Sequence, residues 1–224
     1  MLRSILTTAL LAGLLSGLVV SVVQAVWVTP RILAAEHYEH GHDHGAEGNV
    51  SEATADSLRR TVMTTVANVL TGVGFALLLA AGLSMDGGGG WRTGLLWGLG
   101  GFAAFTVAPS LGLPPSLPGM PEADLAARQG WWVGAAIATA AALWMLFRRG
   151  DRPLWAVAAI ALLTLPHLVG APVLEDGREG PVPVALATAF AQATVVTSLI
   201  FWSVLGSVAG LLLERSRATA GVPA

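Results

Sequence analysis

"SILTTALLAGLLSGLVVSVVQAVWV", residues Ser4–Val28, contains no charged side chain. Because an α-helix needs about 20 mostly apolar residues to cross the hydrocarbon core of a bilayer, this run predicts a membrane-spanning helix. A cleaved secretory signal is the alternative, since Arg3 precedes the run and Val23-Gln24-Ala25 provides a small-x-Ala step. The run is nevertheless longer than the apolar region of about 7–15 residues that is typical of such signals.

The composition of the whole chain also indicates a membrane protein. The mean hydropathy is +0.67, with 54% hydrophobic and 12% charged residues among 224. This is far from the average of soluble domains. Because the chain contains no Cys, disulfides, thiolate metal sites and Cys nucleophiles are excluded, and any metal site must use nitrogen and oxygen ligands.

Five further apolar runs follow the first one. They are Thr61–Leu83, Gly94–Leu113, Trp131–Phe147, Leu154–Ala171 and Val184–Leu213. Lipid leaves no backbone group unpaired and barrel strands would alternate polar with apolar residues, so each run predicts a helix. We expect an all-α, polytopic bundle of about six transmembrane helices, forming a single integral membrane domain over residues 1–224. Five spans are the alternative, because cleavage of the first run would leave five helices.

The charges between the runs predict the orientation. With six spans, one side collects seven Arg and three carboxylates, and the other side collects five Arg and eleven carboxylates. The resulting net charges, +4 and −6, agree with the formal charge of −2 for the whole chain. By the positive-inside tendency, the N- and C-termini are expected in the cytoplasm, and residues 29–60 on the outer side of the membrane.

Glycine pairs one helical turn apart recur in the apolar runs. They are Gly13/Gly17, Gly94/Gly98, Gly130/Gly134 and Gly206/Gly210. Such pairs let helix backbones approach closely in lipid. We expect packing within the chain, and a dedicated dimer interface is the alternative.

The segment "EHYEHGHDHG", residues 36–45, holds four of the five histidines. These are His37, His40, His42 and His44. An extended backbone would direct the last three to one side, whereas a helix would align Glu36, His40 and His44. Imidazole suits Zn, Cu, Ni and Co, and Glu36 and Glu39 add oxygen ligands, so residues 29–60 are interpreted as an outer metal-capture loop. A solvated His-rich connection and a pH sensor are the alternatives.

A second set of polar residues lies in or beside the apolar runs. His167 follows Pro166 near the outer end of the fifth run. A lone His in apolar surroundings is more often a packing residue than a ligand, but ionisable groups at membrane depth tend to mark transport paths. Asn68 and Gln192 are expected to bond across helices, with a polar path as the alternative. Arg128 and Gln129 are further candidates for a structural or path-lining role.

Several segments together resemble the CbtA-type family of predicted cobalt transporter subunits. They include "LLAGLLSGLV" (10–19), "AEHYE" (35–39), "VANVLTGVGFALLL" (66–79), "GLLWGLGGFAAFTVAPSLGLPP" (94–115), "LPHLVGAP" (165–172) and "FWSVLGSVAG" (201–210). The resemblance covers nearly the whole chain. It implies an inner-membrane protein that takes up cobalt for cobalamin synthesis together with a small single-helix, His-containing subunit of the CbtB type.

The resemblance also points to particular residues. Family members are similar in a glutamate–tyrosine–glutamate feature, matched here by Glu36, Tyr38 and Glu39. Their Pro-His pair is matched by Pro166 and His167. The family is often described with five spans, whereas six apolar runs are present here.

We therefore expect a subunit of a divalent transition-metal importer whose substrate is most simply cobalt. A nickel or zinc permease and a membrane-anchored metal chaperone or sensor are the alternatives. No enzyme is expected, because the chain lacks a His-Glu-x-x-His helix, and it also lacks a phosphate-binding loop that would drive transport by its own NTPase. The expected partners are the lipid bilayer and the CbtB-type subunit, and no nucleic acid.

Overall fold

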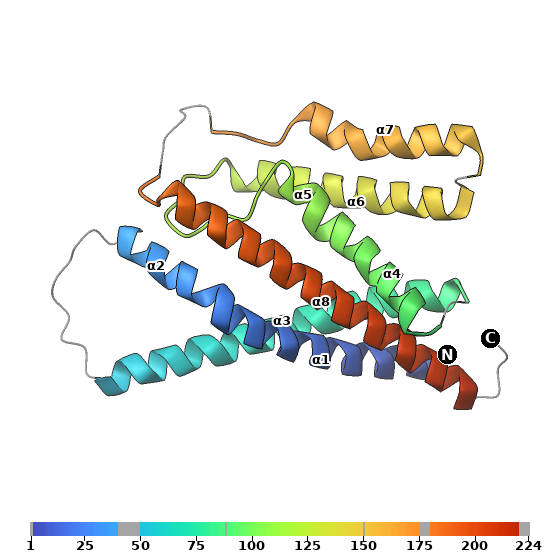
Figure 1. Ribbon diagram of the computed structural model, residues 1–224, viewed down its shortest axis with the longest axis horizontal. Coiled ribbons are helices and arrows are strands. Elements are labelled where there is room, and N and C mark those ends of the chain that lie inside the picture. The colour runs from blue at the N-terminus through green and yellow to red at the C-terminus, as the bar shows by residue number, and fades with distance from the viewer. Residues whose placement is uncertain (1, 40–49, 88, 150, 175–179, 220–224) are drawn as a thin grey trace. The chain divides into compact units, whose positions relative to one another are not determined.

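The structure is a computed structural model that describes residues 2–39, 50–87, 89–149, 151–174 and 180–219. Within these ranges the regular elements are helices and none is a strand, which confirms the all-α class. In chain order (Figure 1) they are α1 (Leu2–Trp27), α2 (Thr29–Glu39), α3 (Val50–Met85), α4 (Trp91–Phe102), the π-helical turn η1 (Ala103–Val107), α5 (Ala108–Ser110), α6 (Leu125–Arg149), α7 (Pro153–Val169) and α8 (Val184–Thr219).

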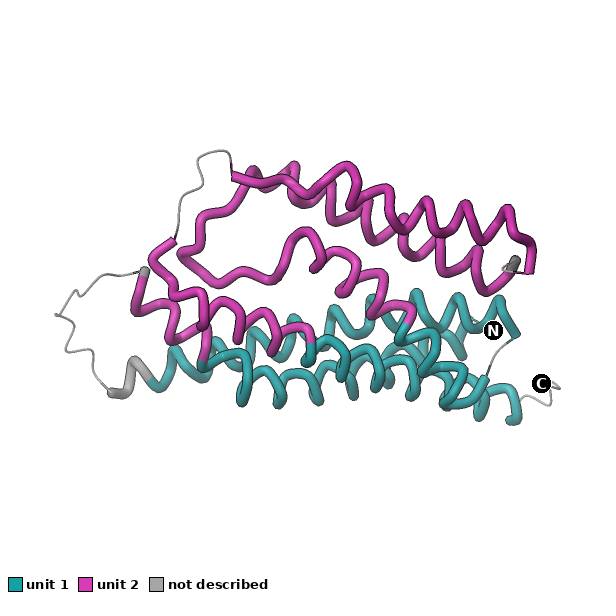
Figure 2. Tube along the Cα trace, turned by 45° about the horizontal axis from the view of Figure 1, so that its top comes forward, with its two compact units in different colours: residues 1–30, 40–99, 196–224 teal, residues 31–39, 100–195 magenta. Residues whose placement is uncertain are grey.

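The chain divides into two compact units, which Figure 2 distinguishes by colour. Unit 1 comprises residues 1–30, 40–99 and 196–224. Unit 2 comprises residues 31–39 and 100–195. Unit 1 therefore holds α1, α3 and most of α4 and α8, and unit 2 holds α6 and α7 with the turn η1.

In unit 1, helices α1 and α3 pack through small residues. A methyl group added at Gly13 would lie 2.5 Å from the Val73 Cα, and one added at Gly17 would lie 2.6 Å from the Val69 Cα. Real Cβ atoms essentially never approach that closely. The first glycine pair thus serves packing within the chain, as the sequence predicts.

Helices α4 and α8 approach each other just as closely along a seam of glycines. We call Gly90, Gly94 and Gly98 on one side, and Gly206 and Gly210 on the other, the α4–α8 seam. A methyl group at Gly94 would lie 2.9 Å from the Gly210 Cα, and the Gly90 N–H donates to the Gly210 carbonyl at 3.1 Å. Backbone therefore meets backbone at these positions.

The last turns of α8 close the connection between α3 and α4. The Arg217 guanidinium donates to the Gly87 carbonyl at 2.6 Å and lies 3.4 Å from the Leu83 carbonyl. Gly87 has a φ of 70°, a left-handed conformation that glycine adopts without steric cost. A cation at this helix end satisfies carbonyls that have no partner within the helix.

In unit 2, helices α6 and α7 lie side by side (Figure 1), and η1 and α5 contact α6. The Phe105 and Trp132 rings pack at 6.1 Å between centroids. The Pro-rich residues 111–124 contain no regular helix, and a hydrogen bond from Met120 N–H to the Leu117 carbonyl at 3.3 Å marks an ordered turn. Four prolines in this stretch, Pro114, Pro115, Pro118 and Pro121, prevent a continuous helix there.

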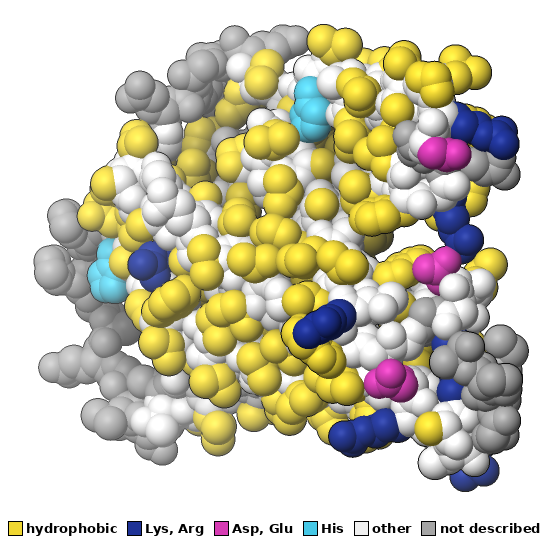
Figure 3. All heavy atoms as spheres, turned by 45° about the vertical axis from the view of Figure 1, so that its right-hand side comes forward, with side chains coloured by type: hydrophobic (Ala, Val, Ile, Leu, Met, Phe, Trp, Pro, Cys, Tyr) yellow, Lys and Arg dark blue, Asp and Glu magenta, His cyan; other side chains and the backbone are white. Residues whose placement is uncertain are grey.

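The distribution of side chains is the one expected for helices in lipid. In α1, Leu10, Leu14 and Leu18 are exposed, whereas Ala9 and Ala12 are fully buried. Hydrophobic side chains are also spread widely over the face drawn in Figure 3. Large apolar side chains on the surface and small ones in the interior are typical of helices surrounded by lipid. This supports the assignment as a membrane protein.

The number of spans is only partly supported. Four helices within the described residues are long and apolar enough to cross a membrane, namely Leu2–Trp27, Thr54–Met85, Leu125–Arg148 and Val184–Thr219. Helix α7 is apolar but has 17 residues. The third expected span, Gly94–Leu113, coincides with α4, η1 and α5 in succession as far as Ser110. The count of six and the orientation of the termini stay predictions.

Two predicted boundaries differ from the structure. The sequence places the start of the fourth run at Trp131, but α6 begins at Leu125 because the Asp124 carboxylate accepts the Ala127 N–H at 2.9 Å and caps the helix. The segment 29–60 is predicted as a loop, but its described ends are helical. Pro30 lies in the first turn of α2, where its missing N–H costs nothing, and α3 already begins at Val50.

Candidate functional site

The last turn of α2 presents the first of the predicted metal ligands. His37 is exposed, and its Nδ1 lies 2.8 Å from the Leu33 carbonyl oxygen. Because a carbonyl can only accept, the Nδ1 carries the hydrogen of this bond. In the neutral ring the Nε2 lone pair is then available, and a backbone carbonyl that fixes the tautomer in this way is a common partner of metal-binding histidines.

The neighbouring predicted ligands are only partly described. Glu36 is half-buried in α2, and Glu39 is the last residue of that helix. His40, His42 and His44 lie outside the described residues, as does the rest of segment 40–49. Their role as metal ligands stays a prediction.

His167 is half-buried in the last turn of α7. Its ring meets the Trp131 ring of α6 edge-on, with 5.8 Å between centroids. The Trp131 Nε1–H donates to the carbonyl of Pro166 at 3.0 Å, and the Gly170 N–H donates to the same oxygen at 3.1 Å. The tryptophan therefore fixes the backbone immediately before His167 as well as one side of its ring.

Gly112 makes room for this arrangement. A methyl group added there would lie 2.7 Å from the Trp131 Cζ2 and 2.9 Å from the Ala171 Cβ. Three chain segments of unit 2 thus converge around the Trp131 indole. The sequence around Gly112 contains no pattern that would have identified this contact.

The predicted ligands do not form a closed metal centre within the described part of the chain. No group of three or more His, Asp or Glu side chains that could hold an ion is present among residues 2–39, 50–87, 89–149, 151–174 and 180–219. His167 is therefore a single imidazole held by aromatic and backbone contacts. It could contribute one nitrogen ligand, with oxygen atoms or water completing the coordination.

Asn68 bonds across helices, as expected. Its Nδ2 donates to Ser21 Oγ at 3.0 Å and to Gln24 Oε1 at 2.7 Å, so that α3 is tied to α1 within unit 1. In lipid, where water does not compete, such amide bonds contribute to helix association. These two bonds support the interpretation as a packing group for this residue.

We expect Asn68→Leu to lower the stability of the folded protein, because Leu fills a similar volume but removes both interhelical bonds. The loss should be about 1 kcal/mol, the scale of such bonds in membranes. Thermal unfolding in detergent measures it, with Gln192→Leu as the control, because Gln192 is exposed on α8. Equal effects of the two substitutions would contradict the assignment.

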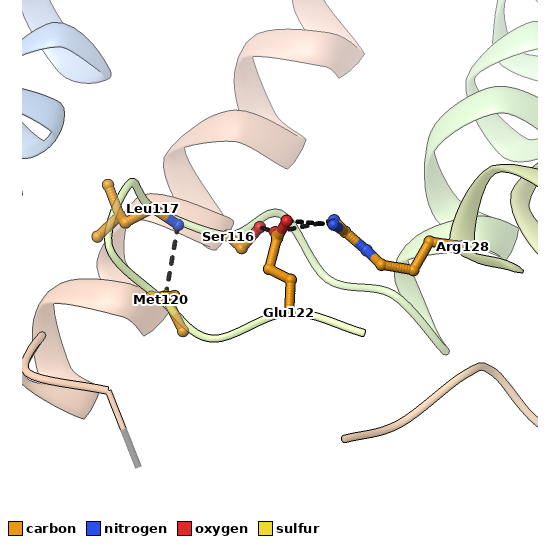
Figure 4. A network of polar contacts seen from close by, with 5 residues as sticks. All are labelled: Ser116, Leu117, Met120, Glu122 and Arg128. Atoms are coloured by element: carbon orange, nitrogen blue, oxygen red, sulfur yellow. Dashed lines mark hydrogen bonds and ion pairs between the residues drawn. The ribbon is translucent and has the colours of Figure 1, made fainter. Parts of the chain in front are cut away.

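The structure gives Arg128 and Gln129 different surroundings. The Arg128 guanidinium binds the Glu122 carboxylate through both terminal nitrogens, with Nη2 to Oε1 at 2.8 Å, and Ser116 Oγ contacts the same carboxylate (Figure 4). This network joins the start of α6 to the Pro-rich turn, where Leu117 N–H also approaches the Met120 sulfur (Figure 4). Arg128 therefore holds the Pro-rich turn against the start of α6, which supports a structural role, whereas Gln129 is exposed.

Comparison with known proteins identifies the family. A family model described as "Probable cobalt transporter subunit (CbtA)" matches residues 2–214, which include all the helices up to the last turns of α8. Neither the curated proteins nor the solved structures contain a match. The match spans far more than half of the chain, and the chain therefore belongs to the CbtA family of probable cobalt transporter subunits.

Proposed function

We propose that this protein is the membrane-spanning subunit of a cobalt importer that supplies Co²⁺ for cobalamin synthesis. The observation that carries the proposal is the family match over residues 2–214, on a chain whose long helices expose apolar side chains. A family of transporter subunits gives no support to an enzyme. The term "subunit" supports a partner, for which we propose a small single-helix, His-containing protein of the CbtB type.

The proposed route begins outside the cytoplasmic membrane. The histidines of segment 36–45 capture the ion, with the Nε2 of His37 as an available first ligand. The capture segment is acidic, which raises the local concentration of divalent cations. The ion then loses part of its water near Glu36 and His167 and moves inward between helices.

The membrane potential can supply the driving force. Moving one charge through 100 mV is worth about 2.3 kcal/mol, so a divalent cation gains about 4.6 kcal/mol on entering a negative interior. This energy allows uptake without an NTPase in the chain. The direction of transport is therefore proposed as inward.

Reconstitution into liposomes tests the function. We expect vesicles with the purified protein, alone or with the CbtB-type subunit, to accumulate Co²⁺ faster than empty vesicles, and more so with an inside-negative potassium diffusion potential. Competition by Ni²⁺ and Zn²⁺ measures the metal preference. Metal that binds to the protein but never enters the vesicle would support a chaperone or sensor instead.

Reporter fusions test the orientation. We expect a reporter fused after Arg217 to be active in the cytoplasm and one inserted in segment 40–49 to be active outside, because the two sides carry net charges of +4 and −6 as counted from the sequence. An external reading for the C-terminus would contradict six spans.

A further inference from the structure

The starts of α1 and α4 and the ends of α3 and α8 meet at one end of unit 1. The Ser4 hydroxyl of α1 lies 2.6 Å from the Ser216 hydroxyl of α8, and Figure 1 shows the start of α1, marked N, beside the end of α8. A methyl group added at Gly90, directly before α4, would lie 3.4 Å from the Glu214 Oε1 of α8. The connection between α3 and α4, which the end of α8 closes, completes this end of the unit.

This end of unit 1 is basic. Residues 2–7, 84–95 and 210–219 carry four Arg and two carboxylates, Asp86 and Glu214, so their net charge is +2. Residues 50–60, at the start of α3, carry two Arg and two carboxylates and therefore no net charge. Because α3 is continuous from Arg59 to Met85, these two positions are about 40 Å apart at 1.5 Å per residue. The two ends of α3 thus lie in surroundings of different charge.

Three of the four arginines at the basic end are exposed. They are Arg3, Arg92 and Arg215, which we call the arginine cluster. Arg3 and Arg215 each directly precede one of the two serines in contact, so both lie near the point where α1 meets α8. Arg92 is the second residue of α4, whose start lies against α8. Arg217 differs from these three, because it is half-buried and donates to backbone carbonyls.

Trp91 places the arginine cluster at the surface of the membrane. Its indole is 49% exposed, and the Arg92 guanidinium lies over the ring, 5.4 Å from the centroid. Tryptophan is enriched where lipid meets water, because its amphipathic ring sits at the level of the headgroups. A guanidinium over such a ring is at the depth of the lipid phosphates, and its planar fork of N–H groups fits two phosphate oxygens at once.

We propose that the arginine cluster binds the headgroup of an anionic phospholipid. The proposal is independent of the transport function and concerns the lipid around the protein. Basic residues near a membrane surface attract lipids that carry a net negative charge. A zwitterionic lipid has the same phosphate, but its own ammonium group offsets the charge. The cluster therefore prefers phosphatidylglycerol to phosphatidylcholine.

Melting temperatures of the protein in a neutral detergent test this preference, because a lipid that binds only the folded protein stabilises it. We expect phosphatidylglycerol to raise the melting temperature about 5 °C more than an equal amount of phosphatidylcholine, the scale for a few arginines that gain anionic lipid. The difference should shrink in about 1 M NaCl, where charges are screened beyond about 3 Å.

Joint replacement Arg92→Gln and Arg215→Gln should remove most of the difference between the two lipids. The melting temperature in phosphatidylcholine should change little, since both side chains are exposed and Gln keeps part of each stem. Arg215→Gln alone, with a smaller expected loss, carries the test if the double variant does not fold.

The matched control is the joint replacement Arg59→Gln and Arg60→Gln. It removes the same charge from the far end of α3 and should keep the full difference between the lipids. Equal losses in the two double variants would overturn the proposal, since only total charge would then matter. Equal stabilisation of the wild-type protein by both lipids would overturn it as well. Inorganic phosphate at the same concentration should have no effect, and stabilisation equal to that by phosphatidylglycerol would overturn a lipid as the ligand.

Discussion

Gly206→Ala is expected to destabilise the protein by about 3 kcal/mol, near the upper end of the usual cost of adding volume to a packed interior. The added methyl group would meet the Gly94 carbonyl oxygen and lie 2.8 Å from the Gly98 Cα. Both neighbours are backbone atoms, which cannot rotate aside as a side chain would. The two helices must therefore separate along the α4–α8 seam, and the Gly90–Gly210 hydrogen bond is lost with them.

Thermal or denaturant unfolding in detergent measures this effect, and Gly74→Ala is its control. Gly74 lies in α3, also in unit 1, and a methyl group there would meet nothing within 4 Å. Alanine is a better helix former than glycine by about 1 kcal/mol, so the control should be neutral or slightly stabilising. A Gly206 variant as stable as this control would show that the close approach is not required.

His167→Ala is expected to lower the maximal rate of Co²⁺ uptake at every metal concentration, while the protein still reaches the membrane. The reason is that His167 is held in one place, by the Trp131 ring at 5.8 Å and by the bond from Trp131 to Pro166. A positioned ligand on the path affects each passing ion. Uptake by proteoliposomes over a range of Co²⁺ concentrations, corrected for the amount of protein, measures the maximal rate.

Joint replacement of His40, His42 and His44 by Ala is the companion experiment. If these residues only concentrate metal outside, the variant should transport poorly when Co²⁺ is scarce and recover when it is abundant. The two variants thus affect different kinetic parameters. A triple variant that is inactive at saturation, beside a normal His167 variant, would reverse the two roles.

Much of the fold follows from the sequence because lipid leaves the backbone few ways to satisfy its hydrogen bonds. Each predicted apolar run coincides largely with helix, since a chain in lipid has few other ways to satisfy its backbone. The glycine pairs predict packing within the chain, and three of the four do pack there. A methyl group added at Gly130 or Gly134 would meet no atom within 4 Å, so spacing alone overstates the role of this pair.

The finer features depend on contacts that local sequence does not encode. The turn η1 lies just before Pro109, inside the run Gly94–Leu113 that the sequence predicts as one helix. The contact of Gly112 with Trp131 joins residues that are far apart in the sequence. No periodic pattern of residue types indicates this contact. Of the candidate ligands, His37 gains a defined tautomer from a bond one helical turn away, which sequence alone does not reveal.

The small residues buried in α1 have a thermodynamic consequence. Ordering a Leu or Met side chain on folding costs conformational entropy, whereas Ala and Gly have no rotamers to lose. The residues buried in this helix are Thr8, Ala9, Ala12, Gly13, Ser16, Gly17 and Val20. The long side chains stay in lipid and keep their rotational freedom, so the helices associate with little entropic penalty even though lipid provides no hydrophobic force between them.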